Sequence, residues 1–309
     1  MERPYILHLF TPGHQASPFD VNMAADAGYQ IITPYTDVGV DLVTALTQDA
    51  IFSRGPKGVA RTGIFVGGRD ALLAADMLER AKEAMFEPFV VSLMADPSGA
   101  YTTAAAMVAC VEAALKRHHG VGLTGLNVLV LGGTGPVGRI AAVLAAKAGA
   151  SVRIASHSGA EAAQKAAVDT GTRFGVELQG VSGAGAAALR LELAQADVVL
   201  ACAAAGVQVV STEDLVFAKN LKVAADVNAV APEGIAGVGV MDDAKPLAGA
   251  AAGAVGIGAL AVGNVKYQTQ HRLLVSMQKA EKAVVLSFPE AFVAARQFLV
   301  EQAAAKPTA

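Results

Sequence analysis

The residues best suited to chemistry form a short glycine-rich segment in the middle of the chain. It reads Gly133-Thr134-Gly135-Pro136-Val137-Gly138, which fits the pattern G-x-G-x-x-G. In such a loop the first glycine permits a tight turn, the second leaves room for a phosphate, and the third lets the next helix pack closely on the strand. The free N–H groups at the start of that helix attract a phosphate. The segment therefore predicts a phosphate-binding loop.

The elements around this loop decide how much the match means. Residues 127–131 are a continuous β-branched and leucine run, typical of a strand buried on both faces. A helix is expected over 135–148 and a second strand over 151–155. Strand, glycine loop, helix and strand are the context that a dinucleotide-binding unit requires. We therefore predict a nicotinamide dinucleotide site rather than an ordinary glycine-rich turn.

The end of the second strand bears on the choice of cofactor. NAD-specific sites usually place an acidic residue there, which binds the ribose hydroxyl and repels the 2′-phosphate of NADP. This chain has Ser156, His157 and Ser158 instead, and no arginine stands beside them. We therefore expect the site to accept both NADP and NAD. Small or polar residues after later strands are candidates for the nicotinamide end, although each could be a simple turn: Ala203, Asn228, Gly256 and Gly258.

The rest of the chain predicts two domains. Strand-like and helix-like stretches alternate through the first hundred residues, which indicates an α/β fold with a parallel sheet. One of these stretches, 50–53, is interpreted as a strand. We expect an N-terminal α/β domain over 1–120, completed by helices within 266–309. A Rossmann-like parallel-sheet domain that binds NAD(P) is expected over 121–265.

Composition limits the possible partners. The chain has 309 residues, of which 53% are hydrophobic, with 24 basic and 27 acidic residues and no block of like charge. Nothing points to nucleic acid or to an anionic membrane surface. The charge-free stretch 247–263 is too rich in alanine and glycine to predict a spanning helix. Cys110 and Cys202 lie in apolar runs, which indicates buried thiols in a reducing compartment, and no metal-binding motif is visible. No secretory signal is visible either, so we expect a cytoplasmic protein.

Several segments, spread over nearly the whole chain, support a more specific comparison. They are Ser17–Asp20, Phe52–Gly55, Thr62–Gly68, Asp96 with Gly99–Ala106, Gly132–Gly138, Ala225–Ala229 and Gly256–Gly258. Together they resemble the bacterial methylene-tetrahydromethanopterin dehydrogenases. The resemblance is closer to the type that uses either NAD or NADP. The strictly NADP-dependent type has a basic pair where this chain has His157-Ser158, and Gly263–Gln268 also resembles the dual-cofactor type.

The resemblance implies a reaction. A hydride passes from methylene-tetrahydromethanopterin to NAD(P)⁺ and leaves the methenyl form, in the one-carbon pathway by which methylotrophic bacteria oxidise formaldehyde. It also implies that the N-terminal domain binds the pterin and that the protein is a homo-oligomer. Loss of hydride from a carbon between two nitrogens leaves a cation that its own resonance stabilises. No proton is removed, so the rate should come chiefly from alignment of the two reacting carbons.

The resemblance also assigns candidate site residues. It implies that Asp20 binds the guanidine-like edge of the pterin, that Phe19 contacts its face, and that Lys266 is an active-site lysine. Arg54 and Asp96 are candidates for positioning substrate. Each has an ordinary alternative: a helix-start carboxylate for Asp20, a core residue for Phe19 and a solvent-reaching lysine for Lys266. For the last two candidates the alternatives are a surface arginine and a turn aspartate.

Other functions remain open at the level of sequence. One alternative is a dehydrogenase of methylene-tetrahydrofolate, or another two-domain dehydrogenase such as a shikimate or amino-acid enzyme. The latter would need a Lys/Asp pair for proton transfer, which we do not find. A non-enzymatic NAD(P) sensor would keep the glycine loop without needing Phe19, Asp20 or Lys266. The first-domain sheet carries no Tyr-x-x-x-Lys pattern near its end, so we expect no cyclohydrolase activity.

Overall fold

The computed structural model describes residues 3–305 and divides into two compact units. Unit 1 is built from the chain up to Thr102 and from Tyr267–Ala294. Unit 2 is built from Thr103–Lys266 and from the chain after Ala294. Both units are α/β structures around a largely parallel sheet, as the sequence predicts.

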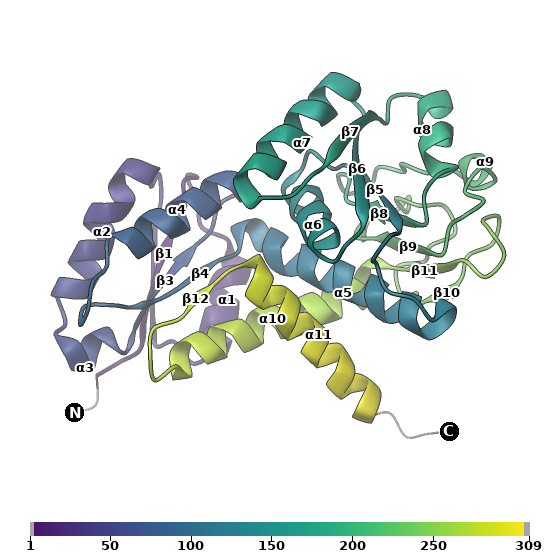
Figure 1. Cartoon of the computed structure of the whole chain (residues 1–309). Coiled ribbons are helices and arrows are strands. Elements are labelled where there is room, and N and C mark those ends of the chain that lie inside the picture. Colours follow the sequence, from purple (N-terminus) through teal and green to yellow (C-terminus); the bar gives the residue numbers. More distant parts are fainter. Residues whose placement is uncertain (1–2, 306–309) are drawn as a thin grey trace. The chain divides into compact units, whose positions relative to one another are not determined.

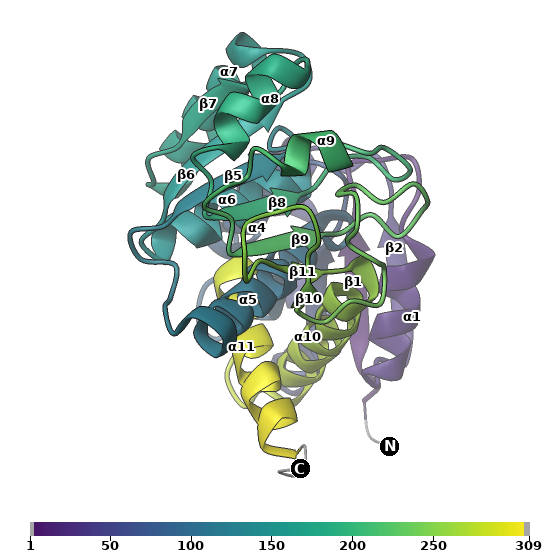
Figure 2. The ribbon, with the colours of Figure 1, turned by 90° about the vertical axis from the view of Figure 1, so that its right-hand side faces the viewer.

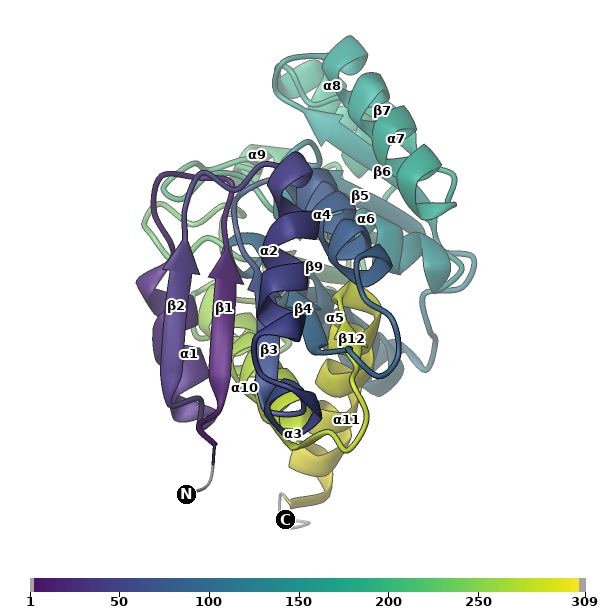
Figure 3. The same ribbon diagram turned by 90° about the vertical axis from the view of Figure 1, so that its left-hand side faces the viewer.

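Unit 1 contains a five-stranded sheet with the order β12-β4-β3-β1-β2 (Figure 3). Every neighbouring pair in this sheet is parallel. The strand β2 lies on one side of β1, and the next strand in the chain, β3, lies on the other side. The order in which strands are added to the sheet therefore reverses between β1 and β3. Ligands of open α/β sheets bind at such a switch point, outside the carboxyl ends of the strands. The strands are β1 (Ile6–Phe10), β2 (Ile31–Tyr35), β3 (Thr62–Val66), β4 (Ser92–Ala95) and β12 (Val285–Leu286).

Helices cover both faces of this sheet. In Figure 3, α2 and α4 lie on one face, and α1 and α10 lie on the other. Pro18 takes the first turn of α1 after Ser17, as the sequence predicts. The interpretation of 50–53 as a strand is wrong, because Val43, Thr47 and Ala50 are buried at helical spacing and residues 50–52 complete α2. The helices are α1 (Pro18–Asp26), α2 (Val40–Phe52), α3 (Pro56–Val59), α4 (Ala71–Glu83), the 3₁₀ turn Pro97–Gly99 and part of α10 (Ala259–Lys279).

Unit 2 contains a seven-stranded sheet with the order β10-β11-β9-β8-β5-β6-β7 (Figure 2). All its neighbouring pairs are parallel except β10 with β11. Counted from β5, the six parallel strands have the order 3-2-1-4-5-6, which is that of the dinucleotide-binding Rossmann fold. The expected Rossmann sheet is thus confirmed. The strands are β5 (Asn127–Leu131), β6 (Ser151–Ser156), β7 (Gln179–Ser182), β8 (Val198–Ala201), β9 (Val223–Asp226), β10 (Lys245–Pro246) and β11 (Val255–Ile257).

Leucines of two short helices close one face of this sheet. Leu189 and Leu193 of α8, together with Leu215 of α9, pack in one buried cluster with Leu129 and Val199 of the strands. The remaining helices of unit 2 are longer. They are α6 (Pro136–Lys147) and α7 (Ala160–Phe174), together with the parts of α5 (Ala100–His119), α10 and α11 (Phe288–Ala305) that belong to unit 2 (Figure 1). The two short helices are α8 (Ala186–Leu193) and α9 (Thr212–Leu215).

The two units divide the chain differently from the expected domains, 1–120 with 266–309 and 121–265. Most of α5 and the end of α11 belong to unit 2. The reason is tertiary packing: the Met107 sulfur lies 3.6 Å from the Cys202 thiol, and a ring nitrogen of His119 lies 3.2 Å from the Lys222 carbonyl oxygen. These contacts attach α5 to the ends of two strands of the Rossmann sheet.

Within residues 3–305, one helical stretch is long and apolar enough to cross a membrane. It covers Pro97–His119, and 78% of its apolar window is buried inside the protein. That burial is typical of a core helix. The alanine- and glycine-rich stretch 247–263 is not one helix, since it contains β11 and only the start of α10.

Candidate functional site

A cavity of about 930 Å³ lies in unit 1 at the carboxyl ends of β1, β3 and β4. Its wall combines segments that follow these three strands: Leu9, residues 11–18, Asp20, residues 67–69 and Ser98. The cavity therefore lies at the switch point between β1 and β3, where the fold predicts a ligand. Its volume is within the range of small-molecule sites.

Asp20 places a buried carboxylate in the wall of this cavity. Its residue is only 4% exposed, and its Oδ1 accepts a hydrogen bond of 2.9 Å from Nε2 of Gln270, which is fully buried. The amide thus holds the carboxylate in one orientation. The adjacent Phe19 exposes 44% of its surface, so its ring is accessible to solvent.

Gln270 is a site residue that sequence reasoning missed. It comes from α10, 250 positions away from Asp20. A signal was nevertheless present, because Gln270 follows Lys266 by four residues and such residues share one face of a helix. Lys266 is half-buried in α10. Its role as the active-site lysine stays a prediction.

The turn after β4 uses Asp96 differently from the expectation. Asp96 is fully buried, and its Oδ1 accepts hydrogen bonds from the backbone N–H groups of Tyr101 and Thr102 at 2.9 and 3.1 Å. Its Oδ2 accepts one from the Thr102 hydroxyl at 2.6 Å. Asp96 therefore anchors the start of α5 and does not line the cavity, which corrects the expected contact with substrate.

The neighbouring Ser98 lines the cavity in place of Asp96. Its backbone is left-handed, with φ 52° and ψ 30°. A non-glycine residue in this conformation costs on the order of 1 kcal/mol and persists only where its surroundings impose it. The hydrogen bonds of Asp96 supply that constraint, since they fix the turn directly before α5.

Arg54 lies at the wrong edge of the sheet to position a substrate in this cavity. Its guanidinium donates to the carbonyl oxygens of Pro4 and Arg61, at 3.0 and 3.2 Å, and to the Thr62 hydroxyl at 2.9 Å. These acceptors stand at the amino ends of β1 and β3. Because the strands are parallel, their amino and carboxyl ends lie at opposite edges of the sheet. The sequence-based expectation for Arg54 is therefore corrected.

The glycine loop follows β5, the strand at the switch point of unit 2. The sequence predicts that Gly133 permits the tight turn, but the structure gives this role to another glycine. The positive φ of the tight turn, 72°, belongs to Gly132. Gly133 instead packs on β6, since a Cβ there would lie 2.5 Å from Cβ of Ile154. A Cβ on Gly138 would lie 2.5 Å from the Gly132 carbonyl oxygen, whereas one on Gly135 would come no closer than 3.4 Å to that oxygen. The third glycine therefore serves close packing, and the second leaves open space beside the helix.

The start of α6 completes the phosphate cradle. Gly135 is the N-cap and Pro136 the first helical residue, which leaves free N–H groups in the first turn. Arg139 connects the loop to α7, because it donates to the Thr134 carbonyl at 2.9 Å and to the Thr170 hydroxyl at 2.7 Å. This geometry fits a dinucleotide pyrophosphate.

The carboxyl end of β6 has the polar but uncharged character that the sequence indicates. Ser156 is buried, and its hydroxyl oxygen accepts a hydrogen bond of 3.1 Å from the backbone N–H of Ser158. His157 and Ser158 are exposed. The first acidic residue after β6 is Glu161, in the first turn of α7.

Asn228 joins the loops that follow β8 and β9. Its Oδ1 accepts hydrogen bonds from the backbone N–H groups of Gly206 and Val230, at 2.9 and 3.0 Å, and its Nδ2 donates to the Pro232 carbonyl at 2.8 Å. The amide is thus occupied by the protein and shapes the edge of the site. Ala203 follows β8, and its backbone nitrogen would lie 2.7 Å from a Cβ on Gly132. The structure therefore brings Ala203 beside the glycine loop.

Asp226, the last residue of β9, is a second residue that sequence reasoning missed. It is 1% exposed, and its carboxylate accepts hydrogen bonds from the backbone N–H groups of Asn228 and Ile235 at 2.9 and 3.1 Å. Burial raises the pKa of this carboxyl despite those donors. An acidic residue that ends an otherwise apolar strand was the available signal.

Gly256 and Gly258 were expected to lie at the nicotinamide end of the site, but the structure does not expose their backbone to a ligand. Both are buried. A Cβ on Gly258 would meet the Gly239 carbonyl oxygen at 2.0 Å, and one on Gly256 would meet Val238 Cγ2 at 3.0 Å. These glycines therefore permit β11 to pack against the segment 238–240.

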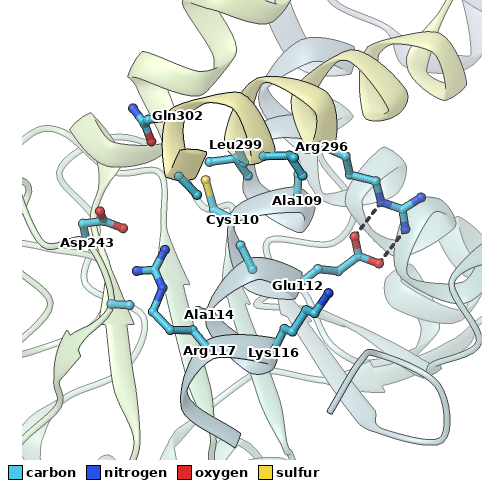
Figure 4. Close-up of a pocket in the computed structure, with 14 residues that line it drawn as sticks. Ala109, Cys110, Glu112, Ala114, Lys116, Arg117, Asp243, Arg296, Leu299 and Gln302 are labelled. Atoms are coloured by element: carbon cyan, nitrogen blue, oxygen red, sulfur yellow. Dashed lines mark hydrogen bonds and ion pairs between the residues drawn. The ribbon is translucent and has the colours of Figure 1, made fainter. Parts of the chain in front are cut away.

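A second cavity, of about 660 Å³, lies in unit 2 between α5 and α11 (Figure 4). Arg296 forms two hydrogen bonds of 2.6 Å with the carboxylate of Glu112 at its side. Burial raises the pKa of the Cys110 thiol in its wall to about 12, which leaves that thiol protonated at neutral pH. None of its lining residues belongs to the glycine loop or to a strand end of the Rossmann sheet. This cavity is therefore separate from the glycine loop.

Comparisons with known proteins agree with this geometry. Residues 18–98 match the family model described as methylene-tetrahydromethanopterin dehydrogenase, N-terminal. A protein of Methylorubrum extorquens named NAD(P)-dependent methylenetetrahydromethanopterin dehydrogenase is 48% identical over 287 residues, which cover 93% of this chain and 96% of the relative. The Bifunctional protein MdtA of the same organism is 36% identical over 279 residues, covering 90% and 94%. Among solved structures, the ligand-free 5-ketofructose reductase of a Gluconobacter strain aligns with a TM-score of 0.52 at 16% identity, covering 96% of this chain and 99% of that one, and shows the shared fold.

Proposed function

The chain belongs to the family of NAD(P)-dependent methylenetetrahydromethanopterin dehydrogenases, and from this we propose that it oxidises methylene-tetrahydromethanopterin with NAD⁺ or NADP⁺. The product is the methenyl form, and the reaction belongs to one-carbon oxidation. The observation that carries the proposal is the cavity at the switch point of unit 1. It holds a buried, oriented carboxylate within the segment that matches the family model.

In this proposal the cavity of unit 1 binds the pterin. The carboxylate of Asp20 accepts hydrogen bonds from the guanidine-like edge, for which paired N–H donors and paired oxygens are well matched. Gln270 holds the carboxylate in place. The exposed ring of Phe19 packs on the pterin face.

The glycine loop of unit 2 binds the dinucleotide. Its fit rests on two observations, the free N–H groups at the start of α6 and the open space beside Gly135. Without a carboxylate at residues 156–158, the ribose end tolerates a 2′-phosphate, which supports use of both cofactors. When bound, the nicotinamide supplies the hydride acceptor. Ala203 is small enough to let its ring approach.

The chemistry asks little of protein side chains. The methylene C–H bond breaks and its electron pair leaves with the hydrogen, so that a neutral substrate becomes a cation while the nicotinamide loses its charge. No proton is released, and no general base is needed. The protein's task is to hold the two carbons in line at roughly 3–3.5 Å. Lys266 would then contact the substrate without transferring a proton.

A direct assay tests this function. The purified protein is mixed with methylene-tetrahydromethanopterin or methylene-tetrahydrofolate, with NAD⁺ or NADP⁺, and the absorbance of the reduced nicotinamide is followed. We expect reduction with the methanopterin substrate and with both cofactors. Absence of reduction with either pterin would refute the proposal. Hydrolysis of the methenyl product should be no faster than without protein.

Two further properties remain part of the proposal, a homo-oligomer and a cytoplasmic location. Exposed apolar side chains on α11 support the first, since Val293 and Val300 expose 63% and 69% of their surfaces. Light scattering after size-exclusion chromatography measures the oligomer mass, and a Val300→Glu variant tests whether α11 lies in the interface. Cell fractionation tests the location.

A further inference from the structure

One buried carboxylate of unit 2 has no positively charged partner. The buried charged residues of this unit, within the described part of the chain, are Arg153, Asp214 and Asp226. Arg153 pairs with Glu192, and Asp214 pairs with Arg190 at 2.7 Å. Asp226 is only 1% exposed, and among residues 3–305 no basic side chain forms an ion pair with it. Because buried charges in proteins are paired or bind metals, Asp226 lacks the counter-charge that the other two have.

The position of Asp226 suggests what the missing counter-charge is. Asp226 is the last residue of β9, and its neighbour across the sheet is Ala201, the last residue of β8. A Rossmann sheet has two halves, and the half that begins with the glycine loop, here β5–β7, recognises a ribose at the end of its second strand. The other half, here β8, β9 and β11, is left for the nicotinamide. Asp226 therefore lies at the strand ends that the nicotinamide is expected to meet.

The loop after β9 holds the carboxylate at this edge without neutralising it. Asp226 Oδ1 accepts a hydrogen bond of 2.9 Å from the N–H of Asn228, and Oδ2 accepts one of 3.1 Å from the N–H of Ile235. A Cβ on Gly234 would lie 2.7 Å from Oδ1, so the loop closes directly over the carboxylate. Burial first, and the negative Glu233 more weakly, raise the pKa of Asp226. The donors are backbone dipoles without net charge, so the site keeps its negative charge.

The charge of Asp226 also acts on the end of β8. Cys202 follows that strand, and burial and then the Asp226 carboxylate raise the pKa of its thiol to about 12. The next residue is Ala203, whose backbone nitrogen would lie 2.7 Å from a Cβ on Gly132. The field of Asp226 therefore reaches the segment that borders the glycine loop.

The two redox forms of the cofactor differ in charge at the nicotinamide. The oxidised ring is positively charged and the reduced ring is neutral, so a buried carboxylate near the ring stabilises the first form alone. We propose that Asp226 supplies this charge and strengthens the binding of NAD(P)⁺ with no such gain for NAD(P)H. The cofactor is then held before hydride transfer and released more readily afterwards, when its charge is gone. The inference rests on the proposed function, because it takes the dinucleotide to be the hydride acceptor.

Equilibrium binding to the full-length protein tests this proposal without catalysis. Calorimetry without the pterin measures Kd for NADP⁺ and for NADPH. Asp226→Asn should raise Kd for NADP⁺ about three- to tenfold more than Kd for NADPH, the scale for unit charges roughly 10 Å apart at an effective dielectric constant between about 20 and 80. NAD⁺ and NADH should show the same difference, because the 2′-phosphate is not involved. Asp226→Ser is a second uncharged variant, used if the first does not fold, since a serine hydroxyl can still accept from the N–H two residues on.

Two matched controls separate the charge from the structure of the loop. Asn228→Ala removes the amide that joins the loops after β8 and β9 and changes no charge, so Kd should rise by the same factor for both redox forms. Asp197→Asn removes a carboxylate from the opposite edge of the same sheet, where Asp197 pairs with Lys222 at 2.5 Å, and the ratio of the two Kd values should stay that of the wild type. An equal rise for both redox forms in the Asp226 variants, or no rise in either, overturns the proposal.

An activity assay separates this inference from the proposed function. A protein that does not oxidise the pterin, but whose ratio of Kd values depends on Asp226, would remove the proposed reaction and keep the charge effect. An active enzyme whose ratio of Kd values does not depend on Asp226 would do the reverse.

Discussion

Gly135 and Gly138 of the phosphate loop should respond differently to substitution by alanine: one change should weaken cofactor binding, and the other should lower stability. In the protein without cofactor, a methyl group on Gly138 would overlap backbone, at 2.5 Å from the Gly132 carbonyl oxygen and 2.8 Å from Cα of Gly133. A methyl group on Gly135 would sit 3.4 Å from its nearest neighbour, with φ −77° and ψ 166°, a conformation open to alanine. The first substitution therefore strains the fold, whereas the second fills space meant for the ligand.

The magnitudes follow from these contacts. Overpacking of this kind costs roughly 1–3 kcal/mol, so Gly138→Ala should lower the free energy of unfolding by about that amount. At about 2–4 °C per kcal/mol, Tm falls by several degrees. For Gly135→Ala, the gain of about 0.4–1 kcal/mol from a stiffer unfolded chain offsets the poorer N-cap, and stability stays near that of the wild type. Loss of one charge-assisted phosphate contact, about 1.5–3 kcal/mol, should weaken NADP⁺ binding about ten- to hundredfold.

Thermal unfolding without cofactor and calorimetric titration with NADP⁺ measure the two effects separately. The expected pattern is a stable Gly135→Ala protein that binds poorly and a destabilised Gly138→Ala protein. A Gly135→Ala variant with normal NADP⁺ affinity would refute the assignment of this loop as the pyrophosphate cradle. A Gly138→Ala variant as stable as the wild type would refute the packing argument.

Three further predictions concern the active site and the sheet beneath it. Gln270→Glu puts a second carboxyl against Asp20, so one of the two carboxyls takes up a proton more readily. We expect KM for the pterin to rise at neutral pH and to recover as pH falls. In Gln270→Leu, KM should not recover as pH falls. Lys266→Ala should lower kcat with little change in NADP⁺ affinity, and a normal kcat would show that another residue fills this role. Burial, and then the nearby Arg54, hold the pKa of His8 below its ordinary 6.5. The stability that neutral His8 contributes is therefore present above pH 6.5 and lost as pH falls toward the lower folded pKa. Denaturant unfolding between pH 7.5 and 5.5 should show a smaller decline in His8→Gln than in the wild type.

The sequence by itself determined the glycine loop and the elements on either side of it, because these parts are local. Strand, loop and helix follow one another between residues 127 and 147, so hydrophobic pattern and glycine spacing were enough to predict them. The helix start at Ser17-Pro18 was local in the same sense and placed Asp20 in the first turn of α1. The substrate came from resemblance alone, since no local pattern specifies a pterin.

Only the tertiary structure decided which distant residues share a site. The contact between Asp20 and Gln270 spans 250 positions, and the helical spacing of Gln270 from Lys266 does not indicate that Asp20 is its partner. Arg54 and Asp96 were plausible site residues by their residue types. The parallel sheet, however, places Arg54 at the opposite edge, and the Asp96 carboxylate accepts hydrogen bonds from the start of α5. The physical reason is that local pattern fixes what an element is, while the order and direction of the strands fix which ends meet. That order is set by packing over the whole chain, and it is what puts residues 67–69 in the same cavity wall as Asp20.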